Sequence, residues 1–245
     1  MKRLSVFVLA VALQTGMVFA EAFPSSISRS AMFVGIPSER LSLGLTYEDI
    51  NIGVDFDRLP DGKLEAQSLA AYVGYDVLPW LTMFGTLGAC EADGDRGIDT
   101  DPGLRISGGA SAYLWEGDVL SPPYMAGRFT VKASLELSYY DSDYASGDVS
   151  WFDVTAALPL GYEIFDDEPE SPKGVDTSLS FYIGPAVRYL SGSWDLGGRS
   201  EDFDGKEMLG LMGGVDIYIS QGLSIGAEAC YFDEATVMGS VRFHL

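Results

Sequence analysis

The chain has 245 residues, with 36 acidic against 15 basic side chains and a formal net charge of −21. This excess of negative charge excludes a nucleic-acid-binding protein, because phosphate recognition needs lysine and arginine, and it disfavours attachment to anionic lipid through a basic patch. Two cysteines do not make a disulfide framework. The 29 glycines, 13 tyrosines and 13 phenylalanines are typical of many tight strands with aromatic belts, although secreted β-sandwiches share this composition.

The first 20 residues have the pattern of a secretory signal peptide. Basic residues open the chain, an apolar stretch covers 4–13, and small residues surround a cleavage position after Ala20 or Ala22. The stretch is too short to cross a bilayer as a helix, and nothing later in the chain reaches the roughly 18 apolar residues that a helical span needs. We therefore expect an exported chain, with an N-terminal segment at 21–38, that enters a membrane only as strands.

From residue 39 onward, segments of about ten residues alternate between apolar and polar side chains. The clearest is 128–139, where odd positions from Phe129 to Tyr139 are apolar and even positions include charges of both signs. A period of two is that of a β-strand with one apolar and one polar face. We count ten such segments: 41–48, 69–75, 81–87, 104–114, 128–139, 152–160, 179–189, 209–219, 223–230 and 237–245. Long links at 116–127 and 163–177 leave eight or twelve strands as alternatives.

The last segment alternates up to the carboxyl terminus, and a final strand without a cap needs partners on both edges. Pairing the last strand with the first satisfies both edges. The sequence therefore predicts an all-β fold, a closed antiparallel up-and-down transmembrane β-barrel of about ten strands over 39–245. An even strand number places both termini on the periplasmic side. The exterior loops, mostly acidic, are then expected at 49–63, 91–103, 141–148, 191–205 and 232–235.

The signal peptide, the turn from Gly74 to Leu81, the alternating spans and the ending Val241-Arg-Phe243-His-Leu245 resemble the small bacterial outer-membrane β-barrel proteins, of the OmpA transmembrane-barrel type without a periplasmic domain. The resemblance implies a monomer in the Gram-negative outer membrane, surrounded by lipid. It also implies that the barrel-assembly machinery recognises the last strand through Val241, Phe243 and Leu245. Members usually end in Phe or Trp, whereas this chain ends in Leu245.

The polar faces of the predicted strands carry charges of both signs. Isolated charges inside a narrow barrel cost desolvation free energy, so we expect these side chains to neutralise one another in a lumen charge ladder. Their length also argues against a wide pore, since a barrel of about ten strands is only a little wider than its side chains can fill. The predicted ladder comprises Arg105, Arg128, Lys132, Glu136, Asp153, Arg188, Asp216, Glu228 and Arg242.

No catalytic residue is predicted. The single histidine, His244, falls at the periplasmic end of the last strand, where it is badly placed to act as a general base near the outer rim. Asp153 and Glu136 lie on neighbouring predicted strands and are a conceivable carboxylate pair, but the charge ladder is the preferred interpretation. We expect neither an enzyme nor a cofactor.

An acidic loop suggests a weak metal site at Asp93, Asp95, Asp99 and Asp101, whose oxygens suit Ca²⁺. The spacing fails the EF-hand pattern, because no Glu closes the loop twelve residues on. A solvated loop is therefore preferred, with a divalent bridge to lipopolysaccharide phosphates as a variant.

The two cysteines, Cys90 and Cys230, share the inward parity near the outer ends of their strands, in an oxidising compartment. In a ten-strand closure the third and ninth strands are four steps apart, which is farther than a disulfide allows. A bond is conceivable but not expected.

These observations predict an outer-membrane β-barrel with a structural or surface-interaction role and acidic exterior loops. Two alternatives stay open: a narrow, porin-like channel for small solutes, and a secreted soluble β-sandwich that binds a ligand. The expected partners are outer-membrane lipid, the assembly machinery and an unnamed surface component, without nucleic acid.

Overall fold

The structure, a computed structural model, describes residues 41–58, 60–93, 100–119, 127–144, 147–165, 178–195, 200–219 and 222–245. The predicted signal peptide and N-terminal segment lie outside these residues. No helix within them is long and apolar enough to cross a membrane. One sheet contains thirteen strands: β1 Leu41–Phe56, β2 Gly62–Leu78, β3 Leu81–Asp93, β4 Thr100–Asp101, β5 Gly103–Val119, β6 Gly127–Tyr144, β7 Gly147–Ala157, β8 Leu160–Phe165, β9 Ser178–Asp195, β10 Ser200–Gly205, β11 Leu209–Ile219, β12 Leu223–Tyr231 and β13 Ala235–His244.

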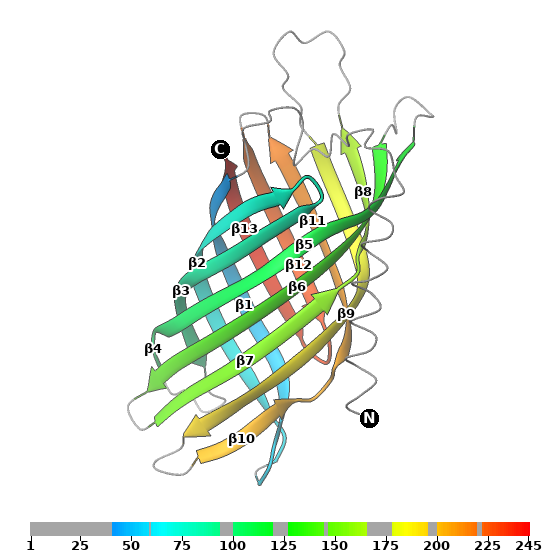
Figure 1. Cartoon of the computed structure of the whole chain (residues 1–245). Coiled ribbons are helices and arrows are strands. Elements are labelled where there is room, and N and C mark those ends of the chain that lie inside the picture. The colour runs from blue at the N-terminus through cyan, green and yellow to red at the C-terminus, as the bar shows by residue number, and fades with distance from the viewer. Residues whose placement is uncertain are drawn as a thin grey trace.

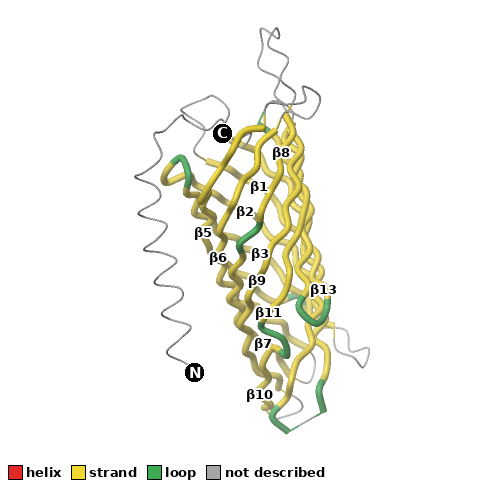
Figure 2. Tube along the Cα trace, turned by 90° about the vertical axis from the view of Figure 1, so that its right-hand side faces the viewer, coloured by secondary structure: helices red, strands yellow, loops and turns green. Residues whose placement is uncertain are grey.

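The sheet closes on itself as a barrel. Every pairing between its strands is antiparallel, and the last strand returns to the first, with β13 paired to β1 from Ser42↔His244 to Asp49↔Val237. The other edge of β1 pairs with β2 over fourteen residues, from Leu41↔Tyr75 to Val54↔Gly62. Figures 1 and 2 show the long strands running obliquely around the wall. The predicted closed barrel is confirmed, and the alternative of a soluble β-sandwich is wrong because the thirteen described strands form one closed sheet.

The wall has ten strands because β7 and β8 act as one. Both pair with β6 in a single register. From Ser134↔Ala157 to Val131↔Leu160, β6 goes back three residues while the partner advances three, so no residue is inserted or skipped between β7 and β8. Between them, the Lys132 amide donates to the Pro159 carbonyl at 3.0 Å. Pro159 has no N–H of its own, which interrupts the hydrogen bonds without shifting the strand. The wall positions are β1, β2, β3, β5, β6, β7 with β8, β9, β11, β12 and β13, which confirms the predicted ten.

The two ends of the barrel differ in their connections. At the terminal end, where β1 begins and β13 finishes, the described turns are tight: Pro79 and Trp80 join β2 to β3, and Gly222 precedes β12 with a φ of 77°. A side chain at Gly222 would also place its Cβ 2.6 Å from the His244 carbonyl oxygen, so glycine suits this turn. At the opposite end, called the far end below, strands extend well beyond the predicted boundaries.

Most of the predicted exterior loops are strand, which corrects that expectation. Region 49–63 holds the end of β1 and the start of β2, and 141–148 and 191–205 are also largely strand. The reason is an inversion of the alternation: on β1 the apolar side chains are outward from Leu41 to Tyr47 and inward from Ile50 to Val54. The period of two continues, but the apolar face changes sides. Within the part of the chain that the structure describes, the turn at 232–234 matches its predicted loop.

A short strand narrows the barrel at the far end. β9 pairs with β11 as far as Val187 and with β10 from Ser191 onward, and β10 pairs in turn with β1, from Val54↔Gly205 to Phe56↔Phe203. β10 therefore replaces β11, β12 and β13 at this level, which changes the ring from ten strands to eight (10 − 3 + 1). We call this eight-strand ring at the far end the collar. Figure 1 shows β10 beside β9 at the end opposite the C-terminus.

Candidate functional site

A band of exposed apolar side chains surrounds the wall between the two ends. On β6 it runs from Phe129 to Tyr139, which are 40% and 39% exposed on the outside of a closed sheet. Ten residue steps at about 3.3 Å, tilted by about 40°, give a height of about 25 Å, which is that of the apolar band of membrane barrels. Aromatic residues mark both margins of the band: Trp80 and Trp115 toward the terminal end, and Tyr47, Tyr139, Tyr189 and Tyr231 toward the far end.

The protein is a transmembrane β-barrel. A closed wall of hydrogen-bonded strands satisfies every backbone group without an edge, and an apolar surface this continuous is stable only against lipid. Its architecture is that of a bacterial outer-membrane barrel. Any functional site therefore lies in the lumen or on the rims.

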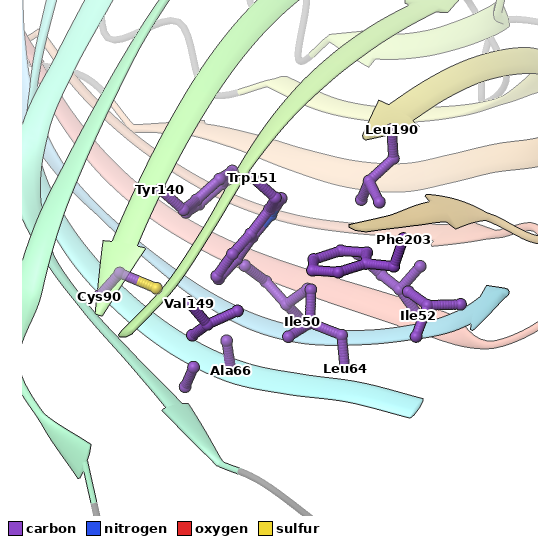
Figure 3. Packing of buried hydrophobic residues seen from close by; sticks show 12 residues of the cluster. Ile50, Ile52, Leu64, Ala66, Cys90, Tyr140, Val149, Trp151, Leu190 and Phe203 are labelled. Atoms are coloured by element: carbon purple, nitrogen blue, oxygen red, sulfur yellow. The ribbon is translucent and has the colours of Figure 1, made fainter. Parts of the chain in front are cut away.

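The far half of the barrel's lumen is filled by apolar side chains. Trp151 is 1% exposed and stacks on Tyr140 with ring centroids 4.7 Å apart. Phe203 reaches in from β10 and packs edge-on against Phe56, with ring centroids 5.7 Å apart. Figure 3 shows Trp151, Tyr140 and Phe203 among the buried side chains that come together from several strands. We call this cluster the apolar plug: Ile50, Ile52, Val54, Leu64, Ala66, Cys90, Ala92, Tyr140, Val149, Trp151, Leu190 and Phe203.

A buried arginine lies beneath the apolar plug. Arg105, 2% exposed, places Nη1 3.0 Å from Oε2 of Glu48 and donates from the same nitrogen to Ser68 Oγ at 2.6 Å. The Tyr140 hydroxyl donates to Glu48 Oε2 at 3.1 Å. Glu136 is farther away, 3.9 Å from Arg105 Nη2. Glu48 is thus the principal partner of Arg105.

A second ion pair crosses from β9 to β7. Arg188 donates from Nε and Nη2 to Oδ2 of Asp153, at 2.5 Å in each case. The Thr155 hydroxyl donates to the other Asp153 oxygen at 2.9 Å. The guanidinium also lies 5.3 Å from the ring centre of Phe232, which enters the lumen from the β12–β13 turn. Both Arg188 and Asp153 are buried, so each needs the other.

These two ion pairs border a cavity of about 60 Å³, which we call the carboxylate cavity. Its walls include four carboxylates: Glu48, Glu136, Asp153 and Glu228. Tyr182 donates its hydroxyl to Glu228 Oε2 at 2.8 Å. Met212, Cys230, Phe232 and Met238 supply an apolar side to the same space.

The terminal half of the lumen is filled by long polar and aromatic side chains. Lys132 lies 4.8 Å from the ring centre of Tyr113, beside a smaller cavity of about 20 Å³ that Asp216 also lines. Arg242 covers the ring of Tyr72 at 4.7 Å. Near the terminal rim, Arg128 donates from Nε to Asp118 at 2.7 Å. Side chains thus extend into the lumen in both its terminal half and its far half.

The structure places all nine residues of the predicted charge ladder on the lumen face, in separate groups rather than one ladder. Arg105 contacts Glu136, and Arg188 contacts Asp153, but Arg128, Arg242 and Glu228 contact partners outside the predicted set. The prediction missed Glu48 and Tyr140. The inward parity of Glu48 on β1 was the available signal for it, whereas nothing in the local sequence indicates that Tyr140 points toward Glu48.

The remaining predicted residues are spread over the molecule. Val241, Phe243 and Leu245 point outward at the terminal end of β13. Asp95, Asp99 and the side chain of Asp93 lie outside the described residues, whereas Asp101 is exposed on β4, opposite Asp143. The described residues contain no group of three or more Cys, His, Asp or Glu side chains that could hold a metal ion. His244 Nε2 lies 3.0 Å from Ser224 Oγ at the terminal end.

The two cysteines are free thiols. Cys90 belongs to the apolar plug, and Cys230 lines the carboxylate cavity, where its Sγ is 3.9 Å from Glu228 Oε1.

Comparison with known proteins finds matches for this chain among solved structures but none among protein families or curated sequences. Among solved structures, it is similar to a COG4313 outer membrane channel from Pseudomonas putida F1, with 8% identity, a TM-score of 0.39, and coverage of 91% of this chain and 99% of that one. It is also similar to Omp33 of Acinetobacter baumannii, with 8% identity, a TM-score of 0.27 and coverages of 84% and 98%. It is similar as well to the β domain of the Bordetella autotransporter Brka, with 13% identity, a TM-score of 0.31, and coverage of 85% of this chain and 100% of that one.

Proposed function

We propose that this outer-membrane barrel is closed to solute flow and has a structural or surface-interaction role. The observation that carries the proposal is the apolar plug. Its side chains are almost fully buried and close the far half of the lumen at the level where the collar reduces the ring to eight strands. An ion entering this space would lose its hydration shell without gaining polar partners.

The proposal places the far end at the cell exterior and both termini in the periplasm. Beyond the apolar band, the outward faces of the strands become acidic, so the rim presents carboxylates to the surroundings: Asp49, Asp55, Glu65, Glu91, Asp141, Asp143, Asp148, Asp202 and Asp204. A surface partner of complementary charge would meet this rim first. The proposal includes a monomeric, non-enzymatic barrel without a cofactor, whose last strand is recognised during assembly through Val241, Phe243 and Leu245.

The test is single-barrel conductance in planar lipid bilayers. We expect the wild-type barrel to be silent and the Trp151→Ala/Ile50→Ala double variant to give discrete current steps, because both side chains are fully buried in the apolar plug. Trp115→Ala is the matched control, since Trp115 is 45% exposed toward lipid and its loss leaves the lumen unchanged. Regular steps from the wild type would overturn the proposal.

A narrow channel for small solutes is the second candidate. The two cavities support it, because polar and charged side chains line both of them within the lumen. If the wild type conducts, and if charge reversal at Glu136 changes its cation-to-anion selectivity, the channel replaces the structural role.

A further inference from the structure

The carboxylate cavity has more negative than positive charge around it. Four carboxylates line it, whereas Arg188 is on its wall and Arg105 lies immediately behind Glu48. Each guanidinium has one close carboxylate partner, Asp153 and Glu48 respectively. Glu136 lies 3.9 Å from Arg105 Nη2 and shares that guanidinium with Glu48, whereas Glu228 accepts a hydrogen bond from Tyr182 and has no ion pair among the described residues. Four carboxylates thus face two guanidiniums, and a cation between Glu136 and Glu228 would reduce this imbalance.

A neutral side chain on the same wall also lacks a partner. Thr236 on β13 lines the carboxylate cavity and is only 6% exposed, yet its Oγ1 makes no hydrogen bond. Buried hydroxyl groups are nearly always hydrogen-bonded, so an orphan hydroxyl at a cavity indicates a missing partner. Thr236 on β13 pairs directly with Cys230 on β12, and Glu228 lies two residues before Cys230 on that same strand. The orphan hydroxyl on β13 and Glu228 on β12 therefore face the same space from neighbouring strands, and Glu136 lines it from β6.

The size and the chemistry of the cavity restrict the cation. A volume of about 60 Å³ is several times the roughly 10–15 Å³ that a cavity needs to hold one water molecule, so a small cation fits it. The described residues hold no group arranged to chelate a metal ion, which disfavours a bare divalent ion. An ammonium group instead donates up to three hydrogen bonds to separate oxygens and carries a single charge. The apolar side of the cavity, with Met212 and Phe232, suits a short alkyl substituent.

We propose that the carboxylate cavity is a binding site for a small primary ammonium ion, held by Glu136, Glu228 and the Thr236 hydroxyl. Charge-assisted hydrogen bonds from the ammonium to the two carboxylates supply most of the affinity. The Thr236 oxygen accepts the remaining hydrogen bond, and the methionine and phenylalanine side chains cover the alkyl part. The site does not depend on the structural role proposed above, because a barrel can bind a small ion whether or not it conducts.

The experiment titrates methylammonium chloride into the refolded full barrel in detergent micelles and measures binding calorimetrically. We expect saturable binding of one ion per barrel. Tetramethylammonium chloride, which has the same charge but no N–H donor, should not bind. This comparison uses only the wild-type protein and so does not depend on the folding of any variant.

Three variants locate the site. Glu228→Gln should weaken methylammonium binding by about tenfold or more, because it removes a charged hydrogen-bond acceptor. Thr236→Val, which keeps the shape but removes the hydroxyl, should weaken it by about two- to tenfold. Glu163→Gln is the matched control, since this carboxylate lines the smaller cavity, and should change the affinity by less than about twofold.

Any of three results would overturn the proposal: no saturable binding by the wild type, equal binding of tetramethylammonium, or a loss in Glu163→Gln as large as that in Glu228→Gln. The conductance of the wild-type barrel decides the proposed function separately. Failure of one therefore does not imply failure of the other.

Discussion

Arg105 shows how much of the lumen's chemistry depends on a single buried charge. Its side chain is 2% exposed and bonds to Glu48 and Ser68 on strands far from it in the sequence. Removing one partner of a buried ion pair leaves the other charged and unpaired. We therefore expect Arg105→Ala to lower the free energy of unfolding by about 3–5 kcal/mol, measured by urea unfolding of the barrel in lipid vesicles.

The double variant Arg105→Leu/Glu48→Leu is the internal control. Because it removes both charges and fills the space with apolar groups, it should recover most of the lost stability. The exposed pair of Lys63 and Glu234, 2.5 Å apart, provides the contrast, and Lys63→Ala should cost less than about 1 kcal/mol. If the double variant were as unstable as Arg105→Ala, the unpaired charge would not be the cause.

At the scale of one residue, the sequence indicated the face but not the partner. Alternation assigns Arg105, Arg188 and Glu228 to the lumen, because parity is a local property of a strand. Partner choice depends on the stagger between strands and on the length of each side chain across the lumen. Arg188 contacts Asp153 through the direct β7–β9 pairing, whereas Tyr140 reaches Glu48 across the barrel, between β6 and β1.

At the scale of the strand, the membrane-spanning parts were predictable and the extensions were not. A strand inside lipid is apolar outside, and the same strand above lipid is apolar inside, so its pattern inverts where it leaves the membrane. On β2 the change falls between Leu64 and Ala66, which are inward, and Leu69, which is outward. Reading the inversion as the end of the strand produced the incorrect exterior loops.

Close strand packing gives a sharp prediction at Gly184 on β9. A Cβ there would lie 2.3 Å from the Leu158 carbonyl oxygen and 2.5 Å from the Pro159 Cα, and neither backbone group can rotate away. Gly184→Ala should therefore shift or break the pairing between β9 and the β7–β8 strand, at a cost of about 1–3 kcal/mol or more. The measurement is the fraction of barrel that shows heat-modifiable gel mobility.

The control for the Gly184→Ala variant is Gly108→Ala on β5. A Cβ at Gly108 meets nothing closer than the Phe84 carbonyl oxygen at 3.7 Å, an ordinary contact. Gly108→Ala should fold like the wild type. Equal losses in the two variants would mean that any residue larger than glycine disturbs the wall, rather than one close approach.

At the scale of the whole molecule, the eight-strand collar and the ten-strand ring that spans the membrane, here called the membrane ring, share strands. The collar depends in addition on the packing of β10 against the apolar plug. Phe203 is the buried contribution of β10 to the apolar plug, packed against Phe56. Phe203→Ala should expose the amides of β10 to hydrogen exchange at least tenfold faster, because losing a buried phenylalanine costs about 3–5 kcal/mol. Amides of β11, β12 and β13 should stay protected, since their pairings do not involve β10.

Phe129→Ala serves as the comparison for that measurement, because Phe129 faces lipid and lies outside the apolar plug. It should leave the exchange of β10 unchanged. Uniform acceleration over all strands in Phe203→Ala would show that the collar and the membrane ring unfold together.

The pairing of β1 has a mechanical consequence. Along one edge β1 is bonded to β2, and along the other it is bonded first to β13 and then, above it, to β10. The barrel is thus closed by two different strand pairings at two levels, β1 with β13 and β1 with β10. Separating the β12–β13 hairpin from β1 leaves the β1–β10 pairing intact, so opening the barrel requires that two separate sets of backbone hydrogen bonds break.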